Sequence, residues 1–295
     1  MELPPDANLR KGDIAMQNVK LNNGVEMPIL GYGVYQVTPA ECERCVRDAL
    51  DVGYRLIDTA QAYFNEAEVG NAIKQSGVKR EDIFLVTKVW ISNAGEEKAA
   101  KSIDESLKKL QTDYVDLLLI HQPFGDYYGT YRAMEKAYKA GKARAIGVSN
   151  FYPDRFIDLS HFCEIQPAVN QVETHVFQQQ KEARKIMEKY NTHIMAWGPF
   201  AEGKNNMFTN ETLVFIGEKY AKSSAQVALR FLTQEGIIVI PKSVKKERME
   251  QNMAIFDFEL TNEEMETIRA LDTGNSLFFS HYDPATVEMI IGLAR

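Results

Sequence analysis

Short apolar runs bounded by turn residues alternate along this chain with longer amphipathic stretches. The apolar runs are hydrophobic at nearly every position, which is typical of strands buried on both faces of a parallel sheet. The stretches between them, such as 97–111, 131–142 and 180–191, repeat apolar residues at helical spacing. This alternation predicts a parallel α/β fold. The eight predicted strands span residues 28–33, 54–58, 83–88, 115–121, 143–148, 168–171, 192–197 and 237–241.

Polar or aromatic residues end nearly all of these strands, although burial in a sheet does not require them. In an eight-stranded barrel the strand ends meet at one mouth, whereas in an open sheet they are spread along an edge. We therefore predict a single (β/α)8 TIM barrel with a functional site at its mouth. The residues at the strand ends are Gly33, Asp58, Lys88, His121, Ser149, Gln171, Trp197 and Lys242.

The remaining organisation is simple. Asn23–Gly24 is a favoured turn pair between two short alternating runs, and it predicts an N-terminal β-hairpin that caps the barrel. Residues 1–15 are expected to form a flexible tail, and because no linker follows, residues 16–295 are expected to form one barrel domain. The longest interval between strand ends, 197–242, contains a polar, Gly- and Asn-containing segment that is a candidate lid.

Composition and charge exclude several classes of function. With 34 Lys and Arg against 41 Asp and Glu, the net charge is −7 and no basic block occurs, so neither nucleic acid nor an anionic membrane is an expected partner. No apolar run approaches the roughly 18 residues of a membrane helix, and the N-terminus lacks the apolar core of a secretory signal. Three cysteines fit a reducing cytoplasm. Cys42 and Cys45 form a C-x-x-C pair, but we expect two unlinked thiols on a helix, since no second pair is near.

One group of residues stands out as candidate chemistry. Sequence motifs of zinc hydrolases, P-loop proteins and α/β-hydrolases are missing, so no metal is expected, and Gly31-Tyr-Gly33 lacks the third glycine of a Rossmann fingerprint. Asp58, Tyr63, Lys88 and His121 remain, at or near adjacent strand ends.

These four residues suit carbonyl chemistry. A phenol has a pKa of about 10, and an ammonium from Lys88 would make Tyr63 a better acid by stabilising its anion. Asp58 would pair with that ammonium, and His121 could donate a hydrogen bond to a carbonyl oxygen. Each residue alone is better explained by packing or by a turn. Together they predict a site that polarises a carbonyl group and transfers a proton to it.

Seven segments, in this order and spacing, resemble the aldo-keto reductases from about Met16 onward: LIDTAQAYFNEAEVG, VTKVW, LLLIHQP, AIGVSNF, VNQVE, AWGPF and IPKSVKKERMEQN. The resemblance implies an (α/β)8 barrel that binds NADPH across its mouth without a Rossmann domain. It also implies that the four residues above are catalytic, and that Ser149, Asn150 and Gln171 bind the nicotinamide carboxamide while Trp197 stacks on the ring. Further residues at the cofactor would be Gly33, Gly198, Pro199 and Phe200, then Lys242, Ser243, Val244 and Arg248 at the 2′-phosphate, and Gln251 and Asn252 at the adenine, with 203–208 over the pyrophosphate.

The sequence departs from the family pattern mainly at positions that would border the substrate pocket. Trp is frequent at the positions of Tyr35 and Gln122, and Glu is frequent at that of Gln251. The loops after His121 and Leu271 are short, which resembles the bacterial 2,5-diketo-D-gluconate reductase branch with its open pocket. The expected pocket residues are Tyr35, Trp90 and Gln122, with Phe278 or Phe279 as a further candidate.

We therefore predict NADPH-dependent reduction of aldehydes or ketones to alcohols, with Tyr63 as the proton donor. A cytoplasmic monomer is expected, acting on a small-molecule carbonyl substrate of the 2,5-diketogluconate or methylglyoxal type. Two alternatives are an NADPH-bound regulatory subunit of a channel and a barrel enzyme that forms a Schiff base between Lys88 and a sugar phosphate. The first has no attachment segment here, and the second leaves Ser149, Asn150 and the segment 242–252 unexplained.

Overall fold

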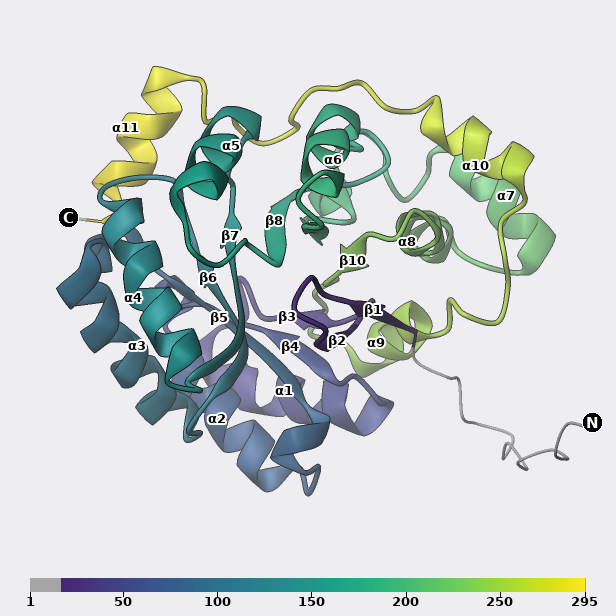
Figure 1. The fold of residues 1–295 in the computed structure, drawn as a ribbon. Helices are drawn as coiled ribbons and strands as arrows, with labels where there is room; N and C mark the ends of the chain where they lie inside the picture. The colour runs from purple at the N-terminus through teal and green to yellow at the C-terminus, as the bar shows by residue number, and fades with distance from the viewer. Residues whose placement is uncertain (1–16, 295) are drawn as a thin grey trace, which may run out of the picture.

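A closed barrel of eight parallel strands forms the centre of the computed structural model, which describes residues 17–294 (Figure 1). The strands follow around the barrel in chain order. The barrel closes between its first and last strands, where the Val239 N–H donates to Ile29 O and the Gly31 N–H donates to Val239 O, both at 2.8 Å. The predicted barrel is confirmed. Its strands are β3 (Tyr32–Gly33), β4 (Leu56–Asp58), β5 (Phe84–Val89), β6 (Val115–Ile120), β7 (Ala143–Ser149), β8 (Val169–Glu173), β9 (His193–Trp197) and β10 (Ile238–Val239).

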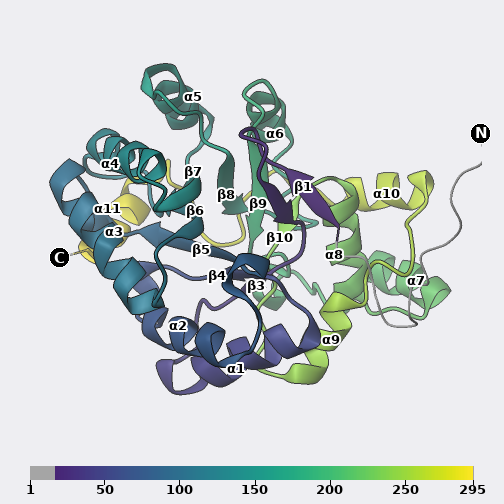
Figure 2. The same cartoon turned by 60° about the horizontal axis from the view of Figure 1, so that its bottom comes forward.

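Helices surround the barrel, as Figures 1 and 2 show from two directions. Every residue of β5 and of β6 is buried, because side chains inside the barrel cover one face of each strand and helices cover the other. The helices are α1 (Pro39–Val52), α2 (Glu66–Gln75), α3 (Glu96–Leu110), α4 (Tyr127–Lys139), α5 (Pro153–Phe162), α6 (Lys181–Glu188), α7 (Glu211–Tyr220), α8 (Ser224–Gln234), α9 (Lys246–Met253), α10 (Asn262–Arg269) and α11 (Pro284–Gly292).

The predicted hairpin closes the amino end of the barrel. Strands β1 (Asn18–Lys20) and β2 (Glu26–Pro28) pair antiparallel, and Gly24 takes the positive φ of 87° that their turn requires. Leu21 and Met27 from this hairpin are buried in one apolar cluster with residues of the barrel interior. The hairpin therefore covers this end of the barrel and adds apolar side chains to its core. The opposite end is the one that remains open for a functional site. The predicted tail, residues 1–15, lies outside the described residues.

Two features of the second half were not predicted. The interval between β9 and β10 contains two helices, α7 and α8. After α10 the chain crosses the barrel and ends in α11, which both views place near α4, on the side away from α10 (Figures 1 and 2). The segment between α10 and α11 consequently runs past the mouth, where it can take part in the site.

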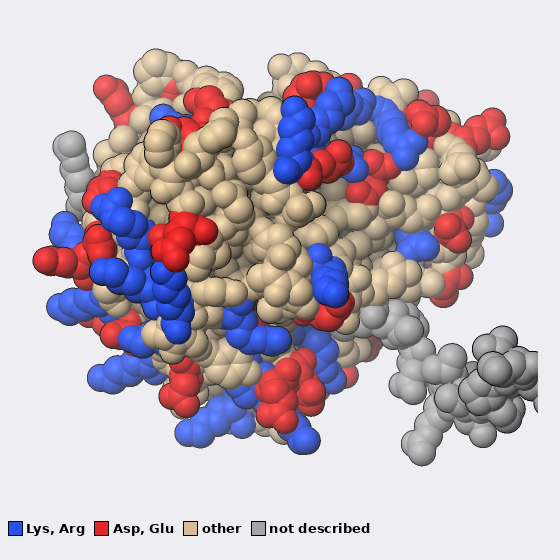
Figure 3. Space-filling view, in the orientation of Figure 1, with Lys and Arg blue, Asp and Glu red and all other residues tan. Residues whose placement is uncertain are grey.

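Charged residues of both signs lie on the surface, and two of the cysteines lie in the core. Lys, Arg, Asp and Glu are intermingled over the face in Figure 3. Cys42 and Cys45 lie buried on α1 as free thiols. Within residues 17–294, no helix is long and apolar enough to cross a bilayer, and no group of three His, Cys, Asp or Glu is arranged to hold a metal ion.

Candidate active site

Four polar side chains meet at the carboxyl end of the barrel. Asp58 is the last residue of β4, Lys88 is the next-to-last residue of β5, and His121 follows β6 directly. Tyr63 belongs to the short 3-10 helix η1 (Gln61–Tyr63) in the loop after β4. The strand ends thus bring together the four residues that the sequence pattern groups.

Lys88 lies at the centre of this cluster. Its Nζ donates hydrogen bonds to Asp58 Oδ1 at 2.6 Å, to the Thr59 carbonyl oxygen at 3.0 Å and to the Tyr63 hydroxyl at 3.4 Å. The Lys88 side chain is fully buried, and that of Asp58 almost fully. Taking an ammonium out of water is costly unless its donors are satisfied. All three donors of Lys88 are used here, and one of the acceptors is the phenol oxygen.

Burial shifts the pKa values of Tyr63 and His121 in opposite directions. Desolvation raises the pKa of Tyr63 well above its usual value of 10, and the Asp58 carboxylate raises it further. The sequence-based expectation was a lowering by Lys88, but Asp58 already neutralises that ammonium and burial dominates. Burial and the charge of Lys88 lower the pKa of His121 well below 6.5. At neutral pH both groups are therefore uncharged, and their ring centroids lie 5.5 Å apart.

A hydrogen bond across the barrel links this cluster to the opposite wall. Gln171 lies in β8, four strands away from β4, and its Nε2 donates to Asp58 Oδ2 at 2.9 Å. The Oε1 atom of Gln171 accepts no hydrogen bond from any residue in 17–294. An amide oxygen is an acceptor, so Gln171 can receive an N–H from a ligand while it orients Asp58.

The other residues predicted at the nicotinamide are bonded to one another. Asn150 Nδ2 donates to the His121 carbonyl oxygen at 3.0 Å, and Asn150 Oδ1 accepts from Trp197 Nε1 at 2.9 Å. The Ser149 hydroxyl donates to the Gln171 carbonyl oxygen at 2.8 Å. Asn150 therefore orients Trp197 and has its amide already engaged. Beyond Trp197, the chain turns at Gly198, whose φ is 63°, while Pro199 is buried and Phe200 half-buried.

The predicted phosphate-binding segment connects β10 to α9. Lys242 and Arg248 are exposed, and neither side chain makes an ion pair or hydrogen bond within the described part of the chain. Ser243 is buried, and its hydroxyl accepts from the Lys245 N–H at 3.1 Å. Two cations thus point outward beside a turn. Of the remaining predicted residues here, Val244 is half-buried, Gln251 is exposed and Asn252 is buried.

Gly33 has a structural reason to be glycine. A Cβ atom at this position would lie 3.0 Å from the Ile240 carbonyl oxygen, across the junction that closes the barrel. Close packing of β3 against the end of β10 therefore favours glycine at this position.

Aromatic side chains border the mouth. The Tyr35 ring centroid lies 5.1 Å from that of Tyr63, and the Trp90 ring lies 4.9 Å from that of His121. Tyr35 is 54% exposed, so the mouth is open on its side. Gln122, the third expected pocket residue, is buried, and its Oε1 lies 2.6 Å from His281 Nε2.

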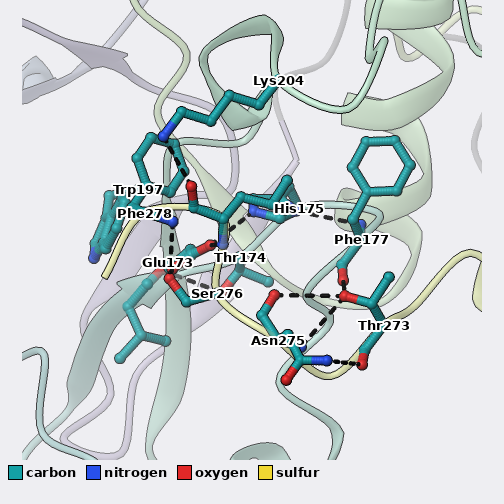
Figure 4. Close-up of polar contacts among 12 residues, drawn as sticks. Glu173, Thr174, His175, Phe177, Trp197, Lys204, Thr273, Asn275, Ser276 and Phe278 are labelled. Atoms are coloured by element: carbon teal, nitrogen blue, oxygen red, sulfur yellow. Dashed lines mark hydrogen bonds and ion pairs between the residues drawn. The ribbon is translucent and has the colours of Figure 1, made fainter. Parts of the chain in front are cut away.

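Glu173 is a functional candidate that the sequence analysis missed. This buried carboxylate ends β8, and it accepts hydrogen bonds from the Ser276 hydroxyl at 2.5 Å and the Leu277 N–H at 2.9 Å (Figure 4). Lys204 reaches the same segment from the loop after β9 and donates to the Leu277 carbonyl oxygen at 2.8 Å. The place of Glu173 at the end of a buried strand, two positions after Gln171, could have indicated that it lies at the mouth.

The segment that Glu173 holds carries two phenylalanines to Trp197. Phe278 meets the indole edge-on, with ring centroids 5.3 Å apart, and Phe279 lies nearly parallel to it at 5.8 Å. Figure 4 shows Phe278 between Trp197 and the Lys204 ammonium. The predicted alternatives, Phe278 and Phe279, are thus both at the mouth.

Comparisons with known proteins agree with this geometry. The model of the Aldo/keto reductase family matches residues 29–273. A glyoxal reductase from Bacillus subtilis is 48% identical over 86% of this chain and 92% of its own. The crystal structure of a putative 2,5-diketo-D-gluconic acid reductase B superposes with a TM-score of 0.85 at 39% identity, over 90% of this chain and 94% of that one. A Bombyx mori aldo-keto reductase in complex with NADP gives a TM-score of 0.83 at 33% identity, over 89% and 94%.

Proposed function

This chain belongs to the aldo-keto reductase family, and we propose that it reduces small aldehydes and ketones to alcohols with NADPH. The observation that carries the proposal is the buried Lys88 ammonium 3.4 Å from the Tyr63 hydroxyl, beside the ring of a neutral His121. The relative named as a glyoxal reductase supports small dicarbonyls of the methylglyoxal type as substrates, and the solved relative named as a putative 2,5-diketo-D-gluconic acid reductase supports keto-sugars.

Reduction of a carbonyl group adds a hydride to its carbon and a proton to its oxygen. A bound NADPH would supply the hydride. Tyr63 supplies the proton, since its raised pKa keeps the phenol protonated at neutral pH. As the proton leaves, charge develops on the phenol oxygen, where the Lys88 ammonium stabilises it. His121 is neutral, so its ring can donate a hydrogen bond to the carbonyl oxygen without competing as an acid.

Side chains around the mouth fit NADPH. Gln171 Oε1 is an unused acceptor for the carboxamide NH2 group, and Trp197 offers an aromatic face held by Asn150. Lys242 and Arg248 are exposed cations suited to the 2′-phosphate. The solved relative with NADP supports this choice of cofactor. We assign to the same site Gly33, Ser149, Gly198, Pro199, Phe200, Ser243, Val244, Gln251 and Asn252, with 203–208 over the pyrophosphate.

Tyr63→Phe tests the proposal. It removes only the hydroxyl, and loss of a general acid typically lowers kcat by about a hundredfold or more. We expect methylglyoxal-dependent oxidation of NADPH to fall by that factor, while NADPH binding, followed by quenching of tryptophan fluorescence, is retained.

Tyr114→Phe is the matched control, because Tyr114 precedes β6 at the opposite end of the barrel and its ring, under Arg80, is kept. This variant should reduce methylglyoxal as fast as the wild-type protein. Near wild-type turnover in Tyr63→Phe, or absence of NADPH-dependent reduction in the wild-type protein with any small aldehyde or ketone, would contradict the proposal.

A further inference from the structure

One buried hydrogen bond joins the residue after His121 to the C-terminal segment. His281 Nε2 lies 2.6 Å from Gln122 Oε1, and the two residues are 5% and 8% exposed, respectively. With Oε1 as the acceptor, Nε2 carries the proton and Nδ1 is a lone pair. This Nδ1 atom is buried and has no partner among residues 17–294. An unsatisfied buried acceptor lowers stability, so packing energy alone does not account for a histidine here.

The ring of His281 lies among aromatic side chains. Phe124 stacks on it with centroids 5.6 Å apart, and Tyr152 and Phe279 meet it edge-on at 5.1 Å and 5.4 Å. Phe279 in turn lies nearly parallel to the Trp197 indole. The hydrogen bond of His281 therefore fixes a ring that contacts Phe279, and Phe279 contacts the aromatic platform of the site.

Ser276–His281, which we call the strap, is held at both ends. Glu173 accepts two hydrogen bonds at its beginning, from the Ser276 hydroxyl and the Leu277 N–H (Figure 4). At its end, Gln122 binds the His281 ring, and the His281 N–H donates to Tyr152 Oη at 3.3 Å. Past the strap, the Tyr282 hydroxyl donates to Asp154 at 3.1 Å, but this contact is exposed. The Gln122 bond is thus the buried anchor at the end nearest to Phe279.

We propose that His281 is a specificity-determining positioning residue: its bond to Gln122 holds Phe279 against Trp197 and so limits the size of substrate that reaches Tyr63 and His121. The inference rests on the proposed carbonyl reduction. Gln122 follows His121 directly, so one bond ties the backbone beside the reacting group to the wall of the pocket. Loss of the bond leaves the longer hydrogen bond from the His281 N–H to Tyr152 Oη at this end of the strap, so Phe279 gains freedom and the pocket widens.

His281→Phe tests the inference, because it keeps a ring of similar size and removes the bond. Pocket contacts of this size change selectivity by about tenfold. We expect kcat/KM for a bulky aryl ketone, relative to that for methylglyoxal, to rise about tenfold, through a lower KM for the ketone and with kcat for methylglyoxal unchanged. Gln122→Leu should raise the same selectivity ratio, and the double variant should raise it no further, since both remove one interaction.

Tyr282→Phe is the matched control, since it removes one exposed hydrogen bond from the adjacent residue. It should leave the selectivity unchanged. Equal selectivity of His281→Phe and the wild-type protein, or additive effects of the Gln122 and His281 substitutions, would overturn the inference.

Fluorescence gives a readout that does not need turnover. The chain has two tryptophans, so in a Trp90→Phe background the emission reports Trp197 alone. His281→Phe should make Trp197 more accessible to acrylamide quenching, and Tyr282→Phe should not. If the wild-type protein reduces no carbonyl compound, the proposed function fails, and the quenching still shows whether His281 holds the strap. Identical quenching in all three proteins would mean that His281 does not position Phe279.

Discussion

Lys88 is fully buried, and its charge depends on a single carboxylate. Asp58 lies 2.6 Å from the ammonium and is itself oriented by Gln171 from across the barrel. Replacing one partner of a buried ion pair leaves the other charge unpaired in a medium of low polarity, which costs more than the pair contributes.

Asp58→Asn should therefore lower the free energy of unfolding by about 3–5 kcal/mol, as measured by urea denaturation. Adding Lys88→Met to this variant should restore part of the loss, because it removes the unpaired ammonium. The interaction energy of the cycle comes from the four proteins together. If the losses of the two single variants simply add in the double variant, the charges are not coupled as described.

Single residues also show what a sequence can reveal about a site. Asp58, Lys88 and His121 were predicted to meet because parallel strands bring their carboxyl ends to one mouth. Tyr63 was grouped with them by proximity in sequence to Asp58. The pairing of Gln122 with His281 could not be predicted, because nothing in the local pattern around either residue indicates that they meet across 159 positions of the chain. The raised pKa of Tyr63 was also missed, since burial of a side chain depends on neighbours from several elements.

At the scale of elements, the turn from β10 into α9 is held in place by other parts of the barrel. The Tyr32 hydroxyl, from β3, donates to the Ser243 carbonyl oxygen at 2.6 Å, and Arg44, from α1, donates to the Val244 carbonyl oxygen at 3.4 Å. Because the backbone of this turn is fixed, the distance between Lys242 and Arg248 varies little. This pre-organisation lowers the entropy lost when a phosphate binds.

Arg248→Ala should raise KM for NADPH by about tenfold, the usual worth of one charge-assisted hydrogen bond, and leave KM for NADH almost unchanged. Lys245→Ala is the matched control, because Lys245 is an exposed cation in the same turn and only its backbone bonds to Ser243. Initial rates with the two cofactors measure the effect. An equal rise in KM for both cofactors would mean that Arg248 does not bind the 2′-phosphate.

Element boundaries were predicted less well than element order. The first strand was expected over 28–33, but Pro28 belongs to the hairpin, and β3 contains only Tyr32–Gly33. Alternation of strands and helices is set by local hydrophobic patterns, whereas strand ends depend on pairing with neighbours. Helix α11 gives a further example. Its sequence, PATVEMIIG, is apolar with little contrast between its faces, so the pattern does not indicate which part of the barrel it packs against.

For the molecule as a whole, two histidines that are uncharged in the folded state contribute to the loss of stability in acid. Burial and then Arg155 lower the pKa of His281 to about 4, and burial and then Lys88 lower that of His121 well below 6.5. The unfolded chain binds a proton at each histidine near pH 6.5, whereas the folded chain does not. Below that pH the unfolded state binds more protons at these two sites, so their contribution to stability falls as the pH falls. Glu66 works in the opposite direction, because burial raises its pKa.

His281→Phe isolates one of these contributions. Each histidine contributes a slope of about 1.4 kcal/mol per pH unit between its folded and unfolded pKa values. The free energy of unfolding of the wild-type protein should therefore drop between pH 6.5 and pH 4.5 by about 2 kcal/mol more than that of the variant, by urea denaturation at each pH. Glu66 and His121 are present in both proteins, so their contributions cancel.

Tyr282→Phe should follow the wild-type curve, since the pKa of that tyrosine is about 12. Parallel curves for His281→Phe and the wild-type protein would show that His281 already carries a proton in the folded state, and the hydrogen bond to Gln122 would then join a charged ring to the amide.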